Sequence, residues 1–371
     1  MFLVPYQQLS NQQKGIIQRV SRGFDNLFVE GPAGTGKTLI SLYAVRDIVN
    51  NQTVRPLVLM YNHSLYGYLK KSFNELEIFD NITIDTKDSF FWNLANNNNV
   101  YVPDEGAYKT KYNVLLDGLL KANLTQKWPI AVVDEIQDFT YKEWKILKTI
   151  AGKIISMGDF NQRVYNTDLE KQDITYTSQL EKLSDIFRFH KNIAKVARVF
   201  NKNNDHIEYN VTKIEQKQPK IIDARNRYEE TREVVNVLKA LKNHQKNIGI
   251  ISADKKRLAE LKEELAGYGI ETTFYTNNRD FRQHDFTSKT PLLLSAHSAK
   301  GLEFENVIVL GFYNTLNDWY NRDLDELIYV SLTRANSGLF IIRTPDTIEK
   351  LRDLKIEEEK KQEVSIDDLF G

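Results

Sequence analysis

The stretch “GPAGTGKT”, residues 31–38, lies between the apolar run “NLFVE” and the helical pattern “LISLYAVRDIVNN”. It fits the pattern G-x-x-x-x-G-K-[ST], and a strand before it with a helix after it is the context that this pattern requires. Its glycines allow backbone N–H groups to turn inward around phosphate oxygens, and the helix N-terminus adds a partial positive field. The stretch predicts a phosphate-binding loop and, taken alone, indicates only a P-loop nucleoside triphosphatase.

The side chains of this loop indicate how the ligand is held. Lys37 supplies charge at the β- and γ-phosphate oxygens, and Thr38 is placed to ligate Mg²⁺. The loop residues expected to contact the nucleotide are Gly31, Pro32, Ala33, Gly34, Thr35, Gly36, Lys37 and Thr38. A nucleoside triphosphate with Mg²⁺ is therefore the expected ligand.

Short β-branched runs alternate with helical patterns along the rest of the chain. The expected strands include “RPLVLMYN”, “IAVVDE” and “KIISMGD” in the first half, and “PKIIDA”, “NIGIISA”, “TPLLLSAHS”, “ENVIVLGF” and “GLFIIR” in the second. Strands separated by helices are typical of parallel sheets with crossover helices. We therefore predict an α/β protein with two lobes, each a mostly parallel sheet flanked by helices.

The composition excludes several classes of protein. A chain of 371 residues is long enough for two domains, and the absence of cysteine excludes disulfides and thiolate metal sites. A reducing compartment, the cytoplasm, is the expected location, since no apolar run approaches the ~20 residues of a membrane span. The 50 basic and 50 acidic residues argue against a protein coated in positive charge. A local basic groove remains compatible with nucleic-acid binding.

An acidic pair follows the strand expected before “DEIQDF”, within residues 131–139. Asp134 and Glu135 stand at the C-terminal end of this strand, which faces the ligand crevice in a parallel sheet. Asp134 is expected to hold Mg²⁺ together with Thr38, and Glu135 is expected to polarise the attacking water as a general base. The next strand end places Gln162 beside the same edge.

The second half of the chain contributes candidate cations for phosphoryl transfer. An arginine finger supplies about 10³–10⁵-fold in rate. Arg188 in “SDIFRFHKNI” and Arg334 in “ELIYVSLTRANSGLFI” are the candidates, and Phe187 offers a ring that stacks on a base. A surface salt bridge is the commoner role of a lone arginine, so this expectation depends on the neighbouring motifs.

Taken in order, these motifs resemble superfamily 1 helicases of the UvrD/Rep/PcrA type. The matching stretches are “LSNQQK”, “GPAGTGKT”, “LVLMYNHSLYGYL”, “IDTKDSFFWNL”, “VVDEIQDF”, “GDFNQRVY”, “FRFHKNI”, “LLLSAHSAKGLEFENVIVL” and “YVSLTRA”. The resemblance implies two RecA-like lobes that hydrolyse ATP between them and a translocase or helicase that moves on single-stranded DNA, 3′→5′. Two alternatives stay open: a nucleotide-switched DNA- or clamp-binding module without processive unwinding, and a translocase on RNA.

The resemblance also implies a role for each matching residue. The residues expected in catalysis are Glu135, Arg334, Arg188, Lys37 and Gln162. Those expected to complete the ATP site beside the loop are Gln13 on adenine, Phe187 stacked on the base, Glu303 at the sugar, and Arg188 and Arg334 at the phosphates. Those expected on the nucleic-acid strand are Tyr61, Asn62, His63, Phe90, Tyr165, His297 and Ser298.

The expected domains are a first lobe over residues 1–175, a second lobe over 176–352 and a charged tail over 353–371. The first lobe carries a reduced insertion at about 95–128, and the second has no large insertion. Full-length family members hold duplex with such insertions, so translocation is a safer expectation here than strand separation.

The tail ends in “EVSIDDLFG”, which places three apolar residues at the spacing of one helical turn. These residues are Ile366, Leu369 and Phe370. The arrangement resembles a sliding-clamp-binding peptide, and a clamp or other replication protein is the expected partner. The alternative is that the tail packs on its own second lobe.

Overall fold

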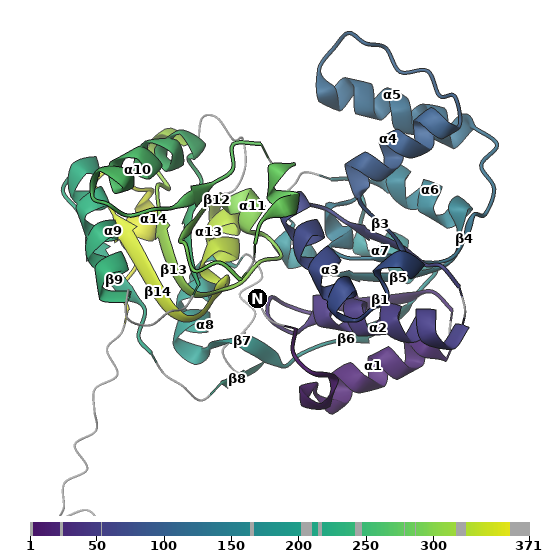
Figure 1. Cartoon of the computed structure of the whole chain (residues 1–371), viewed down its shortest axis with the longest axis horizontal. Coiled ribbons are helices and arrows are strands. Elements are labelled where there is room, and N and C mark those ends of the chain that lie inside the picture. Colours follow the sequence, from purple (N-terminus) through teal and green to yellow (C-terminus); the bar gives the residue numbers. More distant parts are fainter. Residues whose placement is uncertain are drawn as a thin grey trace, which may run out of the picture.

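The computed structural model describes residues 3–22, 25–52, 54–163, 167–201, 210–213, 217–241, 247–277, 279–285, 287–316 and 324–356. Two lobes lie side by side in Figure 1, each built on a six-stranded sheet with helices on its faces. The predicted two-lobed α/β fold of the RecA-like kind is confirmed. None of the helices in these ranges is both long and apolar enough to cross a bilayer.

The first sheet has the strand order β3-β2-β4-β5-β1-β6, and all its pairs are parallel. Its strands are β1 (Leu27–Glu30), β2 (Leu57–Met60), β3 (Thr83–Thr86), β4 (Trp128–Val133), β5 (Ala151–Gly158) and β6 (Gln179–Lys182). Its helices are α1 (Asn11–Ser21), α2 (Lys37–Gln52), α3 (His63–Glu75), α4 (Lys87–Asn97), α5 (Tyr108–Lys121), α6 (Tyr141–Ile150) and α7 (Lys171–Thr175). Every residue of β2 is buried, which explains its unbroken apolar sequence.

The second sheet has the order β11-β12-β10-β13-β14-β9 and is parallel as well. Its strands are β9 (Lys220–Asp223), β10 (Ile248–Ser252), β11 (Thr273–Phe274), β12 (Leu292–Ser295), β13 (Phe304–Leu310) and β14 (Ala335–Arg343). The strands β7 (Ile186–His190) and β8 (Val211–Lys213) form a separate pair. The helices of this lobe are α8 (Lys191–Ala197), α9 (Arg227–Leu241), α10 (Lys255–Gly267), α11 (Ala296–Ala299), α13 (Leu324–Leu332) and α14 (Glu349–Arg352).

The boundary between the lobes differs from the expected one at residue 175. The strand β6 pairs with β1 in the first sheet, so this sheet continues to Lys182. Its sequence “QLEK” is polar because an edge strand is exposed, and the apolar pattern used for the other strands misses it. At the other end, Leu354 packs into the core of the second lobe, which therefore extends past residue 352. The tail from residue 357 lies outside the described residues, with Ile366, Leu369 and Phe370.

The expected insertion in the first lobe, at about 95–128, contains one helix, α5, after the end of α4. From α5 the chain returns to β4, and α5 projects beyond α4 at the upper right of Figure 1. Leu115, Leu116 and Leu119 of α5 are buried in a core cluster that α4 and α6 share. The insertion is therefore packed on the first lobe and is not a separate domain.

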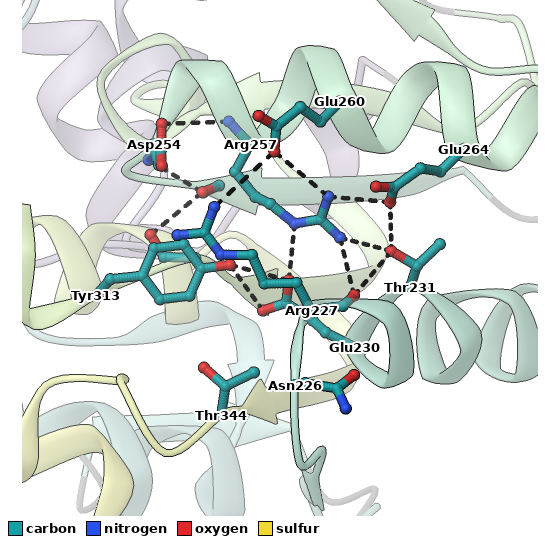
Figure 2. Close-up of polar contacts among 12 residues, drawn as sticks. Asn226, Arg227, Glu230, Thr231, Asp254, Arg257, Glu260, Glu264, Tyr313 and Thr344 are labelled. Atoms are coloured by element: carbon teal, nitrogen blue, oxygen red, sulfur yellow. Dashed lines mark hydrogen bonds and ion pairs between the residues drawn. The ribbon is translucent and has the colours of Figure 1, made fainter.

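A buried polar cluster fixes the outer helices of the second lobe. Arg257 on α10 donates to Glu230 on α9 at 2.8 Å and to Glu264 at 3.0 Å, and the Tyr313 hydroxyl donates to Glu230 at 2.9 Å. Figure 2 shows these side chains converging between the two helices. Buried charges are tolerated when they are paired and hydrogen-bonded. The cluster thus fixes the position of α10, whose first residue is Lys255.

Candidate nucleotide and nucleic-acid sites

A cavity of about 310 Å³ lies between the lobes at the phosphate loop. Residues of both lobes line it. Those that were expected at the nucleotide are Gln13, Ala33, Gly34, Gly36, Lys37, Thr38, Glu135, Gln162, Phe187, Arg188, Glu303 and Arg334. They come from segments far apart in the sequence. The lining also includes residues that were not expected there: Val4, Leu39, Tyr68, Lys213, Gly301 and Asn336. Gly31, Pro32 and Thr35 lie just behind the lining, where their carbonyl oxygens accept hydrogen bonds from Lys37 and Gln13.

Two glycines of the loop cannot be replaced without a clash. Gly34 and Gly36 have φ values of +86° and +87°, a region that side chains rarely adopt. A Cβ on Gly36 would lie 2.3 Å from Nε2 of Gln13, and a Cβ on Gly34 would lie 2.8 Å from the Cβ of Arg188. The loop therefore needs glycine both for its backbone turn and for the close approach of its neighbours.

Gln13 is held rigidly at the edge of the cavity. It forms a capping box with Ser10 at the start of α1, in which its Oε1 accepts from the Ser10 N–H at 2.9 Å. Its Nε2 donates to the carbonyl of Thr35 at 2.9 Å. Phe187 lies across the cavity, partly exposed, and its N–H donates to the carbonyl of Gly34 at 2.9 Å. The amide and the ring are therefore both tied to the phosphate loop.

The amine of Lys37 is buried against its own loop. Its Nζ donates to the carbonyls of Gly31 at 2.5 Å and Pro32 at 3.2 Å. Burial lowers the pKa of Lys37, and Arg188 lowers it further, whereas Asp159 and Glu135 act in the opposite direction. A phosphate in the cavity would favour the charged ammonium by adding a negative partner.

Thr38 and Asp134 form a pair suited to Mg²⁺. The Thr38 hydroxyl donates to Oδ2 of Asp134 at 2.8 Å. Burial and the neighbouring Glu135 raise the pKa of Asp134 to about 6. Within the described residues, no group of three or more His, Cys, Asp or Glu side chains could hold a metal ion. Mg²⁺ typically binds one or two protein oxygens together with substrate phosphates and water, and Thr38 and Asp134 offer two such oxygens.

Glu135 has the environment of an ionised base. It lies in the left-handed region at φ 56°, an unusual backbone conformation that is concentrated at functional sites. Burial raises the pKa of Glu135, but Lys300, Lys37 and a hydrogen bond from Gln137 outweigh burial and lower it below its usual value. The carboxylate therefore stays charged at the edge of the cavity.

Two arginines of the second lobe face the phosphate loop. Arg188 donates to Oε2 of Glu303 at 2.9 Å, and Arg334 is buried and donates to the carbonyls of Val330 at 2.9 Å and Leu302 at 3.3 Å. Burial and the nearby Arg188 lower the pKa of Arg334 to about 9. Arg188 and Arg334 repel each other at the cavity, and a bound polyanion such as a triphosphate would offset this repulsion.

Lys300 is a residue that the sequence interpretation missed. It belongs to the second lobe, yet its Nζ is buried in the first lobe, 2.6 Å from Oδ2 of Asp138, 2.7 Å from the carbonyl of Gln162 and 3.7 Å from Oε2 of Glu135. The stretch “SAKGLEF” was assigned to a motif, but nothing in it marks this lysine as buried. Its backbone carbonyl also accepts from Nδ2 of Asn62 at 2.8 Å.

We expect Lys300→Met to shift the pH profile of hydrolysis toward higher pH. Lys300 is the strongest of the cations that keep the pKa of Glu135 low, so its loss lets burial raise that pKa. The acidic limb of kcat against pH measures the shift. Lys121→Met, at an exposed position on α5, is the control and should leave the limb unchanged. An unshifted limb in a folded Lys300→Met protein would contradict this role.

A second cavity, of about 410 Å³, has residues of both lobes along its walls. The lining residues are Tyr61, Asn62, His63, Ser64, Thr86, Asp88, Lys255, Phe281, Ser295, His297 and Ser298. It brings together the expected strand contacts Tyr61, Asn62, His63, His297 and Ser298. We call it the groove. Lys255, at the start of α10, is a basic lining residue that the motifs did not indicate.

Two side chains of the groove are fixed by neighbours in the first lobe. The ammonium of Lys87, which forms an ion pair with Glu143 at 2.9 Å, lies 5.2 Å from the ring centre of Tyr61. Asn62 caps α3, since its Oδ1 accepts from the Leu65 N–H at 2.7 Å. The Tyr61 ring is thereby positioned at the groove, while the Asn62 amide serves mainly the protein itself.

The expected contact between Phe90 and the strand is corrected by the structure. Phe90 is buried and packs against Phe91 and Trp128, with ring centres 5.3 and 5.4 Å apart. It faces the core because it lies on the inner side of α4, whereas Asp88 at the start of α4 lines the groove. Tyr165 lies outside the described residues.

A cavity that the phosphate loop of one RecA-like lobe and two arginines of the other lobe line places this chain among the two-lobed P-loop nucleoside triphosphatases. The family model of the UvrD-like helicase C-terminal domain matches residues 285–345, and that of the type III restriction enzyme res subunit matches residues 3–158. These matches support assignment to the superfamily 1 helicases, as an ATP-hydrolysing enzyme that acts on nucleic acid. The resemblance seen in the motifs is thereby confirmed.

Solved structures similar to this chain include helicases. One is the C-terminal domain of a possible DNA helicase from Lactobacillus plantarum, at 18% identity and a TM-score of 0.37, over 46% of this chain and 94% of that one. Another is the arterivirus nonstructural protein 10 helicase, at 14% identity and a TM-score of 0.45. That match covers 89% of this chain and 62% of the viral protein. No curated protein matches the sequence significantly.

Proposed function

We propose that the chain hydrolyses ATP with Mg²⁺ between its lobes and uses the cycle to move along single-stranded DNA in the 3′→5′ direction. One observation carries this proposal: Lys37 and Glu135 of one lobe meet Arg188 and Arg334 of the other at a single cavity. A γ-phosphate bound there ties the lobes together, and hydrolysis releases them. The separation of the lobes then follows the state of the nucleotide.

The residues expected at the nucleotide have the following proposed roles. Thr38 and Asp134 hold Mg²⁺, which neutralises the phosphates when it is bound. Glu135 accepts a proton from the attacking water, and Arg188 and Arg334 stabilise the charge on the transferred group. The remaining contacts are Lys37 and Gln162 at the phosphates, Gln13 and Phe187 at adenine, and Glu303 at the sugar.

The groove is the proposed path of the strand. Aromatic side chains such as Tyr61 hold bases by stacking, at about 1–3 kcal/mol per base, without sequence preference. His297 and Ser298 stand on the short helix α11, directly before Lys300, which reaches Glu135. Movement of this segment when a strand binds would therefore reach the general base. The chain itself thus offers a link between strand binding and hydrolysis.

The test combines hydrolysis with motion on matched strands. ATP turnover is measured without a strand, with single-stranded DNA and with RNA of the same sequence, and arrival is timed at a label on either end. We expect DNA to stimulate turnover and the arrival time at the 5′ end to increase with strand length. Arrival at the 3′ end contradicts the direction, and faster motion on RNA selects an RNA track. Tight binding without turnover selects the nucleotide-switched module.

We also propose that the tail binds a sliding clamp through Ile366, Leu369 and Phe370, whose spacing in the sequence matches one helical turn. These residues lie outside the described part of the chain, so the proposal depends on sequence alone. Clamp capture by the wild type and its loss in Phe370→Ala are the expected results. Unchanged capture by Phe370→Ala, or no capture by the wild type, would remove the proposal.

A further inference from the structure

Another cavity, of about 380 Å³, lies in the second lobe. Among its described lining residues, none also lines the nucleotide cavity or the groove. Its walls are α8 with the turn Arg198–Phe200 that follows, Gln218 before β9, and residues 354–356 after α14. The last wall is held in place, because Leu354 packs into the core and its carbonyl accepts from Arg343 at 3.0 Å. We call it the α8 cavity.

The charged residues that line the α8 cavity are all basic within the described part of the chain. They are Lys191, Lys195, Arg198 and Lys355. Lys191 and Lys355 are exposed, and neither forms a hydrogen bond or an ion pair among the described residues. Several cations around one concave surface produce a positive potential that attracts an anion. The expected ligand is therefore negatively charged.

The same cavity also has apolar walls. Val196, Val199, Leu354 and Ile356 line it, and the side chain of Val199 is 40% exposed. A nucleic-acid backbone is bound mainly through charged and polar groups, whereas an acidic peptide also brings apolar side chains to cover such residues. The mixed lining therefore favours a peptide that carries both carboxylates and apolar groups.

Asn192 adds a donor to this lining. The residue is 4% exposed, and its Nδ2 has no hydrogen-bond partner within the described residues. Buried amide nitrogens are nearly always paired, since an unpaired one loses its hydrogen bonds to water without replacement. A carboxylate or a peptide carbonyl bound in the cavity offers Asn192 the acceptor that it lacks.

The chain itself contains a segment with the required composition. Residues 363–370, “EVSIDDLF”, hold three acidic and four apolar residues and no basic one. Ile356 lines the cavity, and nine residues, 357–365, connect it to Ile366. Nine residues span at most about 30 Å, and a short flexible linker gives an effective concentration in the millimolar range. Even a weak match between segment and cavity is therefore sufficient for binding within one chain.

We propose that the α8 cavity binds residues 363–370 of the same chain. Asp367 and Asp368 pair with Lys191 and Lys355, and the apolar side chains of the segment cover Val199 and the other apolar lining residues. The residues proposed to bind a sliding clamp belong to this segment, so the segment cannot occupy the cavity and a clamp at once. Docking on the second lobe thus competes with an external partner for the tail.

The first test measures the distance between tail and cavity in the full chain. The chain has no cysteine, so Ser365→Cys with Gln218→Cys gives a single pair for a short bis-maleimide. We expect this pair to cross-link within one chain about tenfold faster than Ser365→Cys with Asn236→Cys, an exposed position on α9. Equal rates for the two pairs would overturn the docking. Cross-links mainly between two chains would replace it with docking on a second copy.

Charge reversal tests which residues hold the segment. Lys191→Glu with Lys355→Glu should lower the fast cross-linking rate to that of the Asn236→Cys pair. The matched control, Lys239→Glu with Lys256→Glu, changes two exposed lysines of α9 and α10 that do not line the cavity, and it should keep the fast rate. A control that loses the rate to the same extent would show a general effect of charge and would overturn the assignment to this cavity.

A labelled peptide of residues 362–371 gives an independent measurement. We expect it to bind full-length Phe370→Ala about tenfold more tightly than the wild type, whose intact tail occupies the cavity. Adding Lys191→Glu with Lys355→Glu to Phe370→Ala should weaken the peptide at least tenfold. Equal affinity in all three proteins would contradict the proposal.

The rival occupant is nucleic acid. A DNA oligonucleotide that loses affinity in Lys191→Glu with Lys355→Glu, together with cross-linking at the rate of the Asn236→Cys pair, would assign the cavity to a phosphate backbone and overturn the peptide. None of these measurements uses a clamp or ATP. The docking is therefore decided separately from the proposed motor activity and from clamp binding.

Discussion

Replacing Glu135 with glutamine is expected to lower kcat for ATP hydrolysis by about 10²–10⁴-fold while nucleotide binding is retained. The carboxylate is kept ionised by Lys300 and Lys37 and lies at the edge of the nucleotide cavity. Glutamine has nearly the same shape but does not accept a proton from water. Affinity depends mainly on the phosphate loop and on Gln13, which this change does not touch.

Single-turnover hydrolysis and equilibrium binding of a fluorescent ATP analogue measure the two effects separately. Glu75→Gln, at an exposed position on α3, is the matched control and should leave both unchanged. A loss of ATP affinity as large as the loss of kcat would show that Glu135 maintains the structure of the phosphate loop and does not act on the attacking water. Hydrolysis within tenfold of the wild type would remove Glu135 as the general base.

Replacing Arg334 with alanine is expected to lower kcat by about 10³–10⁵-fold, the range of an arginine finger. Arg334 lies on the lobe opposite Lys37, and burial together with Arg188 lowers its pKa to about 9. The charge that develops on the transferred phosphoryl group relieves this repulsion, so the interaction is strongest in the transition state. The expected loss is therefore in kcat more than in ground-state affinity.

Because Arg334 also bonds carbonyls of its own lobe, the alanine variant requires a test of folding. Arg334→Lys keeps the positive charge but loses the planar guanidinium with its several N–H donors. It should therefore recover only part of the wild-type rate of hydrolysis. Arg343→Ala, which removes another partly buried arginine of the same lobe away from the cavity, controls for general destabilisation. Hydrolysis by a folded Arg334→Ala protein within tenfold of the wild type would contradict the motor proposal.

The sequence predicted which residues gather at the cavity beside the phosphate loop, because phosphate chemistry ties residue types to fixed positions. A loop that wraps phosphate needs glycines at φ values of +86° and +87°, followed by a lysine at the start of a helix. A carboxylate at the end of a buried parallel strand has to face the same edge. The positions of Gly34, Gly36 and Glu135 can therefore be predicted from the few residues around each of them.

Features of the site that depend on packing were not predictable. The sequence around Phe90 matched a motif, but the side of α4 that meets the core decided that this ring is buried. Likewise, the strand β6 is polar and short, and only its pairing with β1 assigns it to the first lobe. In both cases the deciding contact comes from a segment distant in the chain.

The sequence by itself determined the two-lobed fold, the phosphate loop and the candidate catalytic residues. Each of these can be predicted from the residue types and spacing within a short segment. The tertiary structure decided how the lobes communicate. In the sequence, Lys300 is only a lysine that follows a stretch of small residues, and folding brings it to Asp138. Arg282 is only an arginine in a polar segment, and folding brings it to Asp85. Whether two charged side chains of different lobes form an ion pair depends on how close the folded chain brings them. No repeating pattern in the sequence indicates that distance.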